Sequence, residues 1–249
     1  MSGNMRAKQK PHKNETLDTI KDVKLFQAKN GYRFSVDAVL LEHFISAGKL
    51  GNGIELGCGS GVISILLARR AKDVNITAVE IQKSLSERAL RNVHLNRLDD
   101  RITILSKDLR ELKTVYETNA FDFVFSNPPF RKPKTGRISS DEERAVARHE
   151  IEMTVSDLIS AAAYLLKHTG KFFLIYHPLR LAELITLLRE SKLEPKRMRF
   201  VHSMKGEEAK MVLIESVKGA GVWLKIDPPL YLYKAKNEYS PEVKKIFNK

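Results

Sequence analysis

The stretch Phe121-Asp122-Phe123-Val124-Phe125-Ser126-Asn127-Pro128-Pro129-Phe130 joins an apolar run to a turn that cannot continue it. Residues 121–126 are few, aromatic and β-branched, which predicts a buried strand. Pro128 and Pro129 have no backbone N–H and hold φ near about −65°, so the strand must end at Asn127. Open α/β sheets bind their ligands at the carboxyl ends of strands, so we expect this rigid turn at the functional edge of a sheet.

Asn127, Pro128, Pro129 and Phe130 together suit the recognition of a planar –NH2 group. The side-chain oxygen of Asn127 can accept one N–H, and a carbonyl of the proline pair can accept the other. Two acceptors on one nitrogen draw its lone pair out of conjugation and toward a donor methyl group. Phe130 offers a ring on which a base or an amide can stack. The alternative is an ordinary turn that ends a strand, and the tetrapeptide alone leaves both interpretations open.

Strand and helix signals alternate along most of the chain. Short apolar runs predict strands at 53–56, 75–79, 102–105, 121–125, 171–176, 196–201 and 210–217. Apolar residues at helical spacing predict helices at 36–45, 62–70, 85–95, 155–166 and 179–190. This alternation is typical of an α/β fold, in which a doubly wound parallel sheet carries helices on both faces.

Three local signals predict where helices begin or end. Ser84 with Glu87, and Thr154 with Asp157, have the spacing of capping boxes at helix starts. Gly170 stands where a glycine is expected to cap the end of a helix.

The chain divides into a short tail and one domain. Residues 1–15 are basic and lack apolar periodicity, which predicts a mobile N-terminal tail. No linker divides residues 30–249, so we expect residues 16–249 to form a single domain. Residues 131–148 are polar and basic, with Gly136 as a hinge candidate. They are either a lid or phosphate-contacting loop, or simply a solvated loop.

The 249 residues include 43 Lys and Arg against 30 Asp and Glu, a net charge of +13. This excess favours a polyanionic partner, nucleic acid before membrane, although a Lys- and Glu-rich composition also marks heat-adapted proteins. No apolar run approaches the ~20 residues of a membrane span, and residues 1–6 do not resemble a secretory signal. The single cysteine, Cys58, excludes an internal disulfide and fits a reducing compartment, so we expect a cytoplasmic protein.

The histidines do not predict a metal centre. His94, His149 and His202 show no metal-ligand spacing with one another or with Cys58. His177 follows a predicted strand near the presumed cleft, where a structural role and contact with substrate are both open interpretations.

The stretch Glu55-Leu56-Gly57-Cys58-Gly59-Ser60-Gly61 links a predicted strand to its helix. Val62 stands where the last glycine of the dinucleotide fingerprint would be, so that fingerprint is broken. Glycines let the backbone approach a ligand, and Glu55 favours an amine over a phosphate. Glu80 ends the next strand, where a carboxylate can accept ribose hydroxyls, and Asp108 follows the third, where an acid can meet an adenine amino group. Each of these acids alone could be an ordinary surface residue. Three acids at three successive strand ends are harder to explain as surface residues.

Taken together, the glycine stretch, Glu80, Asp108 and Asn127 to Phe130 resemble the motifs of class I S-adenosylmethionine-dependent methyltransferases that methylate amino groups. The resemblance is closest to the valine-tRNA adenine-N6 methyltransferases and their methyltransferase small domain relatives. It covers about residues 16–240 and includes three more stretches, Phe34–Leu41, Ala147–Glu150 and Phe200–His202. It implies a seven-stranded Rossmann-like sheet with an antiparallel last strand, and S-adenosylmethionine as cofactor.

The resemblance also implies a role for each site residue. The methionine end of the cofactor would lie against Glu55 and the loop with Gly57, Cys58, Gly59 and Gly61. The rest of the cofactor would contact Glu80, Ile81, Asp108, Leu109 and Asn127, with Glu80 at the ribose and Asp108 and Leu109 at the adenine. Asn127 and the two prolines would present the target nitrogen, and Phe130 would stack on the base. Phe130 replaces the more common tyrosine, which removes a hydroxyl and keeps the ring.

The expected reaction is N6-methylation of an adenine in tRNA, the adenosine 3′ of the anticodon of a valine tRNA, with a basic surface docking the RNA. One alternative is N5-methylation of a glutamine in a protein such as a peptide release factor, because the same acceptors serve an amide. Another is N-methylation of a different exocyclic amine in RNA or DNA. A third is an RNA-binding module without catalytic activity, although the complete set of motifs argues against it.

Overall fold

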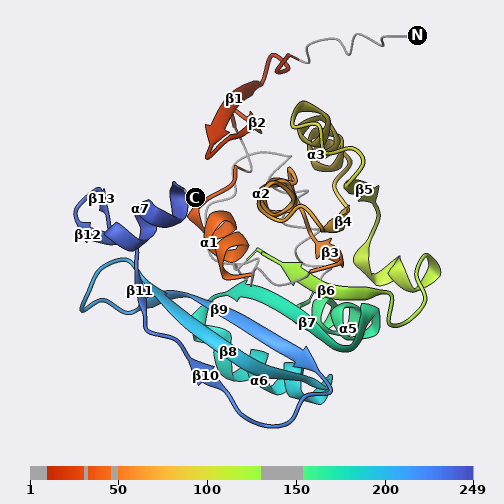
Figure 1. Ribbon diagram of the computed structural model, residues 1–249, viewed down its shortest axis with the longest axis vertical. Helices are drawn as coiled ribbons and strands as arrows, with labels where there is room; N and C mark the ends of the chain where they lie inside the picture. The colour runs from red at the N-terminus through yellow and green to blue at the C-terminus, as the bar shows by residue number, and fades with distance from the viewer. Residues whose placement is uncertain (1–9, 31–32, 46–49, 130–153, 249) are drawn as a thin grey trace.

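The computed structural model describes residues 10–30, 33–45, 50–129 and 154–248. Its centre is a nine-stranded sheet in the order β10-β8-β9-β7-β6-β3-β4-β5, with β11 also paired to β8 (Figure 1). In chain order its strands are β3 (Asn52–Leu56), β4 (Asn75–Glu80), β5 (Ile102–Ser106), β6 (Phe121–Ser126), β7 (Leu166–Tyr176), β8 (Leu193–His202), β9 (Ala209–Lys218), β10 (Lys225–Ile226) and β11 (Leu230–Tyr231).

The sheet confirms the predicted fold class. All seven predicted strands are present as β3 to β9, and β3 to β7 run parallel to one another. The last of the seven, β9, is antiparallel to both β7 and β8. The two short strands β10 and β11 extend the sheet beyond the predicted set.

Helices cover both faces of the sheet, as the alternating pattern predicts (Figure 1). The α-helices are α1 (Val36–Phe44), α2 (Val62–Arg70), α3 (Lys83–Leu95), α5 (Val155–Leu165), α6 (Leu181–Glu190) and α7 (Pro241–Phe247), and the 3₁₀ helices are η1 (Leu109–Thr114) and η2 (Pro178–Arg180). In the described residues, no helix is both long and apolar enough to cross a bilayer.

Two apolar cores lie on opposite faces of the sheet because successive side chains of a strand alternate between them. Phe123 and Phe125 of β6 pack into the core that includes α1, α2 and α7. Val124, between them, packs into the core that includes η1, α5 and α6. All three side chains are buried, which explains why this strand reads as a continuous apolar run.

Two of the three predicted helix signals are wrong. The box of Thr154 and Asp157 is confirmed at the start of α5. Ser84 does not cap α3, because that helix begins earlier and Gln82 takes the N-cap position. Gly170 lies inside β7 rather than after a helix. An added Cβ at Gly170 would stand 2.8 Å from the Lys167 carbonyl oxygen, so this glycine provides room for the close backbone.

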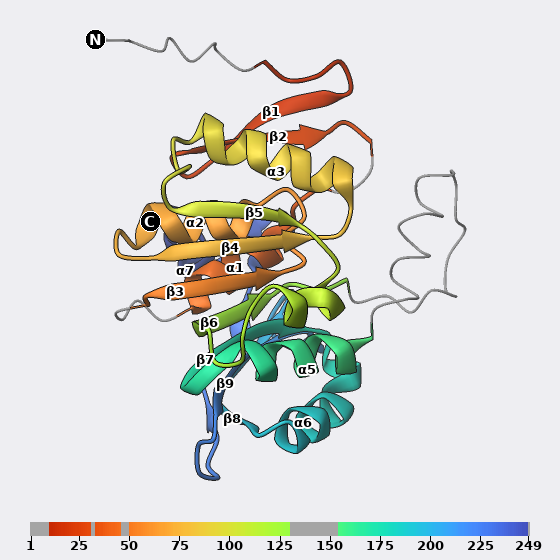
Figure 2. The same ribbon diagram turned by 90° about the vertical axis from the view of Figure 1, so that its right-hand side faces the viewer.

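A hairpin of β1 (Glu15–Ile20) and β2 (Val23–Ala28) stands apart from the central sheet and packs against α3 (Figure 2). A second small hairpin, β12 (Tyr233–Ala235) with β13 (Glu238–Tyr239), precedes α7. Asn92 of α3 is fully buried and accepts a hydrogen bond from the Phe26 N–H at 2.7 Å. Its amide also donates to the carbonyl of Phe26 and to that of Ser60 in the glycine loop. The hairpin is therefore tied to the loop that follows β3.

Glu15 anchors the start of the hairpin. Its carboxylate is buried and forms ion pairs with Arg88 at 2.9 Å and Arg91 at 2.8 Å, both on α3. Burial alone would raise the pKa of Glu15. Hydrogen bonds from Arg91, the backbone N–H of His12 and Arg88 outweigh burial and lower the pKa to about 2.

Replacing Glu15 with Gln should destabilise the protein by about 2–3 kcal/mol at pH 7, because two buried guanidinium groups lose their counter-charge. The pKa is lower in the folded than in the unfolded state, so this stabilisation is present above pH 4.5 and is lost as pH falls toward 2. Urea unfolding of both proteins at pH 7 and pH 3 measures the difference. Glu87→Gln, at an exposed ion pair on the same helix, is the control and should change stability by less than about 0.5 kcal/mol. An equal effect of the two substitutions would contradict the anchoring role.

Candidate active site

The carboxyl ends of β3, β4, β5 and β6 meet at one edge of the sheet (Figure 2). Glu80 pairs with Ser106 across β4 and β5, and Glu55 pairs with Phe125 across β3 and β6. The residues that follow these strands therefore emerge side by side. The predicted site residues include residues from the ends of all four strands, and the fold brings them to this one edge.

The loop after β3 is held by the end of β4. The N–H groups of Gly57 and Cys58 donate to the carbonyl of Val79 at 3.0 and 2.9 Å. Gly57 has a φ of 77°, which is in the left-handed region that favours glycine. A Cβ built on Gly57 meets no atom of the described residues within 4 Å, so among them the space beside this glycine is open. The backbone of Gly57, which has no side chain, therefore faces an open space at the edge of the sheet.

Glu55 is buried at the end of β3, with 1% of its surface exposed. Its carboxylate accepts hydrogen bonds from the hydroxyl and the N–H of Ser64 on α2. Burial raises the pKa of Glu55 to about 8, an effect reinforced by the nearby charge of Glu80 and opposed by the bonds from Ser64. The side chain therefore carries a proton at neutral pH until a cation approaches it.

Cys58 is buried in the same loop. Burial, together with the charges of Glu55 and Glu80, raises the pKa of its thiol. A thiol that stays protonated is a poor nucleophile, so Cys58 fills space in the loop rather than supplying reactive chemistry.

Glu80 connects two loops at the end of β4. One carboxylate oxygen accepts the N–H of Gly59 at 2.8 Å, and the other accepts the N–H of Gln82 at 2.9 Å. A carboxylate can accept several hydrogen bonds at once, which is the chemistry that recognition of hydroxyl groups requires. Ile81 follows Glu80 and is 41% exposed, which leaves an apolar side chain at the surface of this edge.

Asp108 caps η1 at the end of β5. It accepts the N–H of Arg110 at 2.9 Å and forms an ion pair with the Arg110 guanidinium. The carboxylate is mostly shielded, with 17% of the side chain exposed. Leu109 is buried in the core beneath it. An adenine amino group at Asp108 would therefore share this carboxylate with Arg110.

Asn127 directly follows β6 and is half-buried, Pro128 is buried and Pro129 is exposed. The hydroxyl of Ser126, whose side chain is fully buried, donates to the carbonyl of Leu56 at 2.6 Å. This bond joins the residue before Asn127 to the residue before Gly57. Phe130 and residues 131–148 lie outside the described residues.

Several residues that shape the site carry no signal that would have identified them in advance. Ser64 acts on Glu55 from nine positions away, and Asn92 reaches Ser60 from α3. Ser126 is the exception, since its place directly before Asn127 marks it as part of the same stretch.

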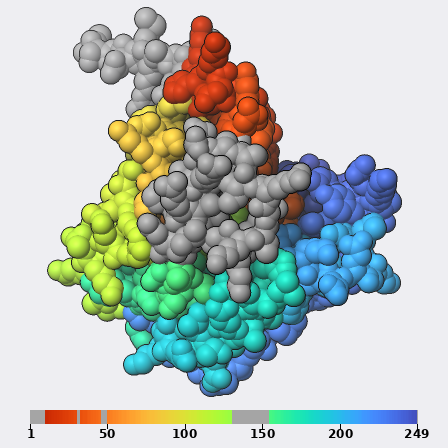
Figure 3. Space-filling model, turned by 180° about the vertical axis from the view of Figure 1, so that it is seen from behind, coloured from red at the N-terminus to blue at the C-terminus, as the bar shows by residue number. Residues whose placement is uncertain are grey.

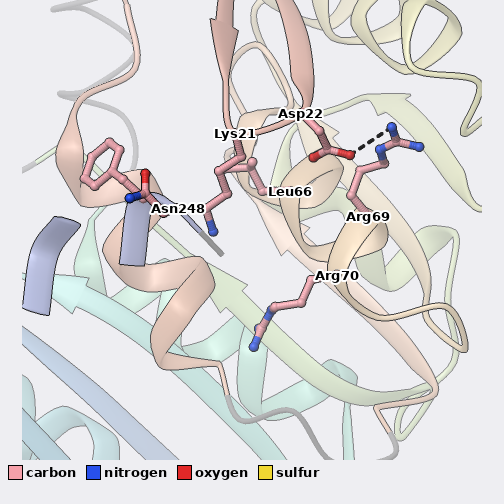
Figure 4. A pocket seen from close by; sticks show the side chains of 7 residues that line it. Lys21, Asp22, Leu66, Arg69, Arg70 and Asn248 are labelled. Carbon is pink, nitrogen blue, oxygen red and sulfur yellow. Dashed lines mark ion pairs between the residues drawn. The ribbon is translucent and has the colours of Figure 1, made fainter. Parts of the chain in front are cut away.

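A separate pocket lies at the opposite edge of the sheet, where α2 ends and the β1–β2 turn reaches it (Figure 4). Its cations are paired: Arg69 with Asp22 at 3.0 Å, Lys21 with Glu42 at 2.9 Å, and Arg70 with the same Glu42. It is lined by Lys21, Asp22, Leu66, Arg69, Arg70, Phe247 and Asn248, none of which is a predicted site residue.

Curated relatives match the chain over most of its length. A tRNA1(Val) (adenine(37)-N6)-methyltransferase from Porphyromonas gingivalis is 30% identical over 219 residues, which are 84% of this chain and 85% of the relative. A protein of the same name from Shewanella loihica is 32% identical and covers 71% of this chain and 72% of the relative.

Solved structures share the fold at lower identity. A predicted O-methyltransferase from Agrobacterium tumefaciens has a TM-score of 0.69 at 21% identity and covers 85% of this chain and 95% of its own. TYW2 from Pyrococcus horikoshii, solved in complex with MeSAdo, has a TM-score of 0.60 at 14% identity and covers 84% of this chain and 73% of its own.

The family model of the methyltransferase small domain matches residues 35–191. This span runs from the start of α1 to the end of α6 and includes the glycine loop, both buried acids and Asn127. The sheet order and the relatives above agree with this match. The chain therefore belongs to the methyltransferase small domain family and is an S-adenosylmethionine-dependent methyltransferase.

Proposed function

We propose that this enzyme methylates N6 of an adenine in tRNA, the adenosine 3′ of the anticodon of a valine tRNA. The observation that carries the proposal is the alignment of relatives with that named activity over most of both chains. The position of Asn127 and its prolines at the edge that carries Glu55 and Glu80 supports it. The net charge of +13 suits an RNA substrate, and the proposal includes the cytoplasm as the place of action.

The residues at the edge fit the cofactor chemically. Bound S-adenosylmethionine supplies a methyl group on a positively charged sulfur. In the proposal Glu55 receives the amine of the methionine end, because a buried carboxyl can become the counter-ion of an ammonium. The open space beside Gly57 admits the ligand. Glu80 accepts hydrogen bonds from the ribose hydroxyls, and Ile81, Asp108 and Leu109 contact the adenine.

Asn127 holds the acceptor amine in this proposal. Its side-chain oxygen accepts one N–H of the target –NH2 group, and a carbonyl of Pro128 or Pro129 accepts the other. The bond from Ser126 to Leu56 keeps this pair of acceptors at a constant position relative to the glycine loop. Phe130 stacks on the target base, which must leave its own stack to reach the edge.

A direct test uses two candidate acceptors. The protein and labelled S-adenosylmethionine are incubated separately with unmodified total tRNA and with a peptide release factor. Mass spectrometry of the products should identify N6-methyladenosine from the tRNA. Label found only in the release factor would replace this proposal with glutamine methylation.

Asn127→Ala should lower kcat for methyl transfer at least about a hundredfold, because the target nitrogen loses one of its two acceptors. The affinity for S-adenosylmethionine, measured by calorimetry, should change less than about threefold, since the cofactor rests mainly on other residues. Asn127→Asp keeps an acceptor oxygen and serves as the comparison. A variant Asn127→Ala that turns over at nearly the wild-type rate would exclude this mechanism.

Gly57→Ala should weaken S-adenosylmethionine binding at least about tenfold, because the new methyl group occupies the open space and strains a positive φ. Gly206→Ala is the matched control. Gly206 also has a positive φ of 90° and open space around it, but it lies in the turn between β8 and β9. Both substitutions should cost similar stability, about 1–2 kcal/mol. Equal cofactor affinity in the two variants would argue against cofactor binding at Gly57.

The affinity for S-adenosylmethionine should rise with pH between 6 and 7.5. The pKa of Glu55 is about 8 in the free protein, so below that pH binding of an ammonium must first displace a proton. The dissociation constant should therefore fall by about tenfold per pH unit in this window. Calorimetry in two buffers of different ionisation enthalpy counts the released proton. Glu55→Gln should bind weakly and without this pH dependence, and a flat profile for the wild type would refute the role of Glu55.

A further inference from the structure

The turn η2 lies beside the candidate acceptor site. Leu174 of β7 pairs with Ser126 at the end of β6. Strand β7 continues to Tyr176, and His177 then leads directly into η2. The turn therefore begins at the same edge as Asn127, on the strand next to it.

Leu179, in the middle of η2, is 88% exposed, which is the highest value among the large apolar side chains that the structure describes. The turn that carries it is well held. The N–H of Leu179 donates to Nδ1 of His177 at 3.2 Å, and the Arg180 guanidinium donates to the Tyr176 hydroxyl at 3.0 Å. Arg180 also forms an ion pair with Glu183 at 2.6 Å. A fixed backbone thus presents an apolar side chain to solvent next to the acceptor site.

The start of β9 borders η2. Tyr176 pairs with Val212, so the residues just before Val212 lie alongside the start of η2. Lys210 of β9 and Lys205 of the preceding turn are exposed, and neither forms an ion pair with any residue that the structure describes. Glu207 and Glu208, between the two lysines, are exposed as well. Figure 3 views this face, where the cyan surface of the η2 and α6 region lies next to the light-blue surface of the β8–β9 region.

From this arrangement we infer that Leu179, Lys205 and Lys210 form a docking surface for the RNA substrate, which we call the η2 surface. This inference rests on the proposed function. A base that leaves its stack exposes the faces of its neighbours, and an inserted apolar side chain can cover them. Leu179 would contact a base next to the target adenine, and the two lysines would contact backbone phosphates. The occupant is the RNA that carries the target adenine, because Leu179 lies just after the strand end next to Asn127.

The role of Leu179 is tested with Leu179→Ala in steady-state kinetics on unmodified tRNA. We expect kcat/KM for tRNA to fall about tenfold while KM for S-adenosylmethionine stays unchanged. The control is Val222→Ala, at a side chain that is 75% exposed but follows β9 at the opposite edge of the sheet. With tRNA carrying 2-aminopurine at the target position, the rise in fluorescence on binding should be less than half of the wild-type rise for Leu179→Ala and unaltered for Val222→Ala.

The lysines are tested with the double variant Lys205→Gln, Lys210→Gln. We expect weaker tRNA binding and a slope of log affinity against log salt that is smaller by about two, one for each lost phosphate contact. Lys72→Gln, at an exposed lysine between α2 and β4, is the control and should leave the slope unchanged.

The outcomes separate the two claims. If the wild type does not methylate tRNA, the proposed function fails. If it does, and Leu179→Ala and the lysine variant behave like their controls in kinetics, fluorescence and salt dependence, the η2 surface alone is refuted.

Discussion

The parallel register of β4, β3 and β6 is the constraint on which the site depends. Three strands that run the same way end at one edge, so the loops that follow them must converge there. The bond from the Ser126 hydroxyl to the Leu56 carbonyl extends this pairing one step past the last ladder contact. It ties the end of β6, just before Asn127, to the end of β3, just before the glycine loop.

The buried acids show how this edge tolerates charge. Backbone N–H groups of two loops donate to the buried carboxylate of Glu80. The carboxylate of Glu55 accepts hydrogen bonds from Ser64, and burial raises the pKa of Glu55 to about 8. A carboxyl group with such a raised pKa is neutral near pH 7 until a cation approaches it.

The N-terminal hairpin has more than a covering role. Asn92 satisfies both backbone groups of Phe26 and a carbonyl of the glycine loop with one buried side chain. Glu15 holds the other end of the hairpin against α3 through two arginines. The hairpin and α3 therefore hold the glycine loop, although neither belongs to the strands that define the fold.

Local signals were reliable where strand periodicity or proline was involved, and less so where a single residue type was used as a marker. Gly170 was predicted to end a helix, but it serves the close packing of β7 against the Lys167 carbonyl. Ser84 matched a capping pattern, but α3 starts before it. In both cases a tertiary or neighbouring contact overrides the local preference, because one residue contributes only about 1 kcal/mol to either choice.

The sequence by itself determined the α/β class, the seven main strands and the acids and asparagine that follow them, because alternation of apolar runs and strand-ending residues is local information. Only the tertiary structure decided the partners of these residues. The pairs Ser126 with Leu56, Ser64 with Glu55 and Asn92 with Phe26 join positions from nine to 70 residues apart. The raised pKa of Glu55 and the contact of η2 with β9 follow from the same long-range packing, in which burial and neighbouring charges arise only once the sheet has formed.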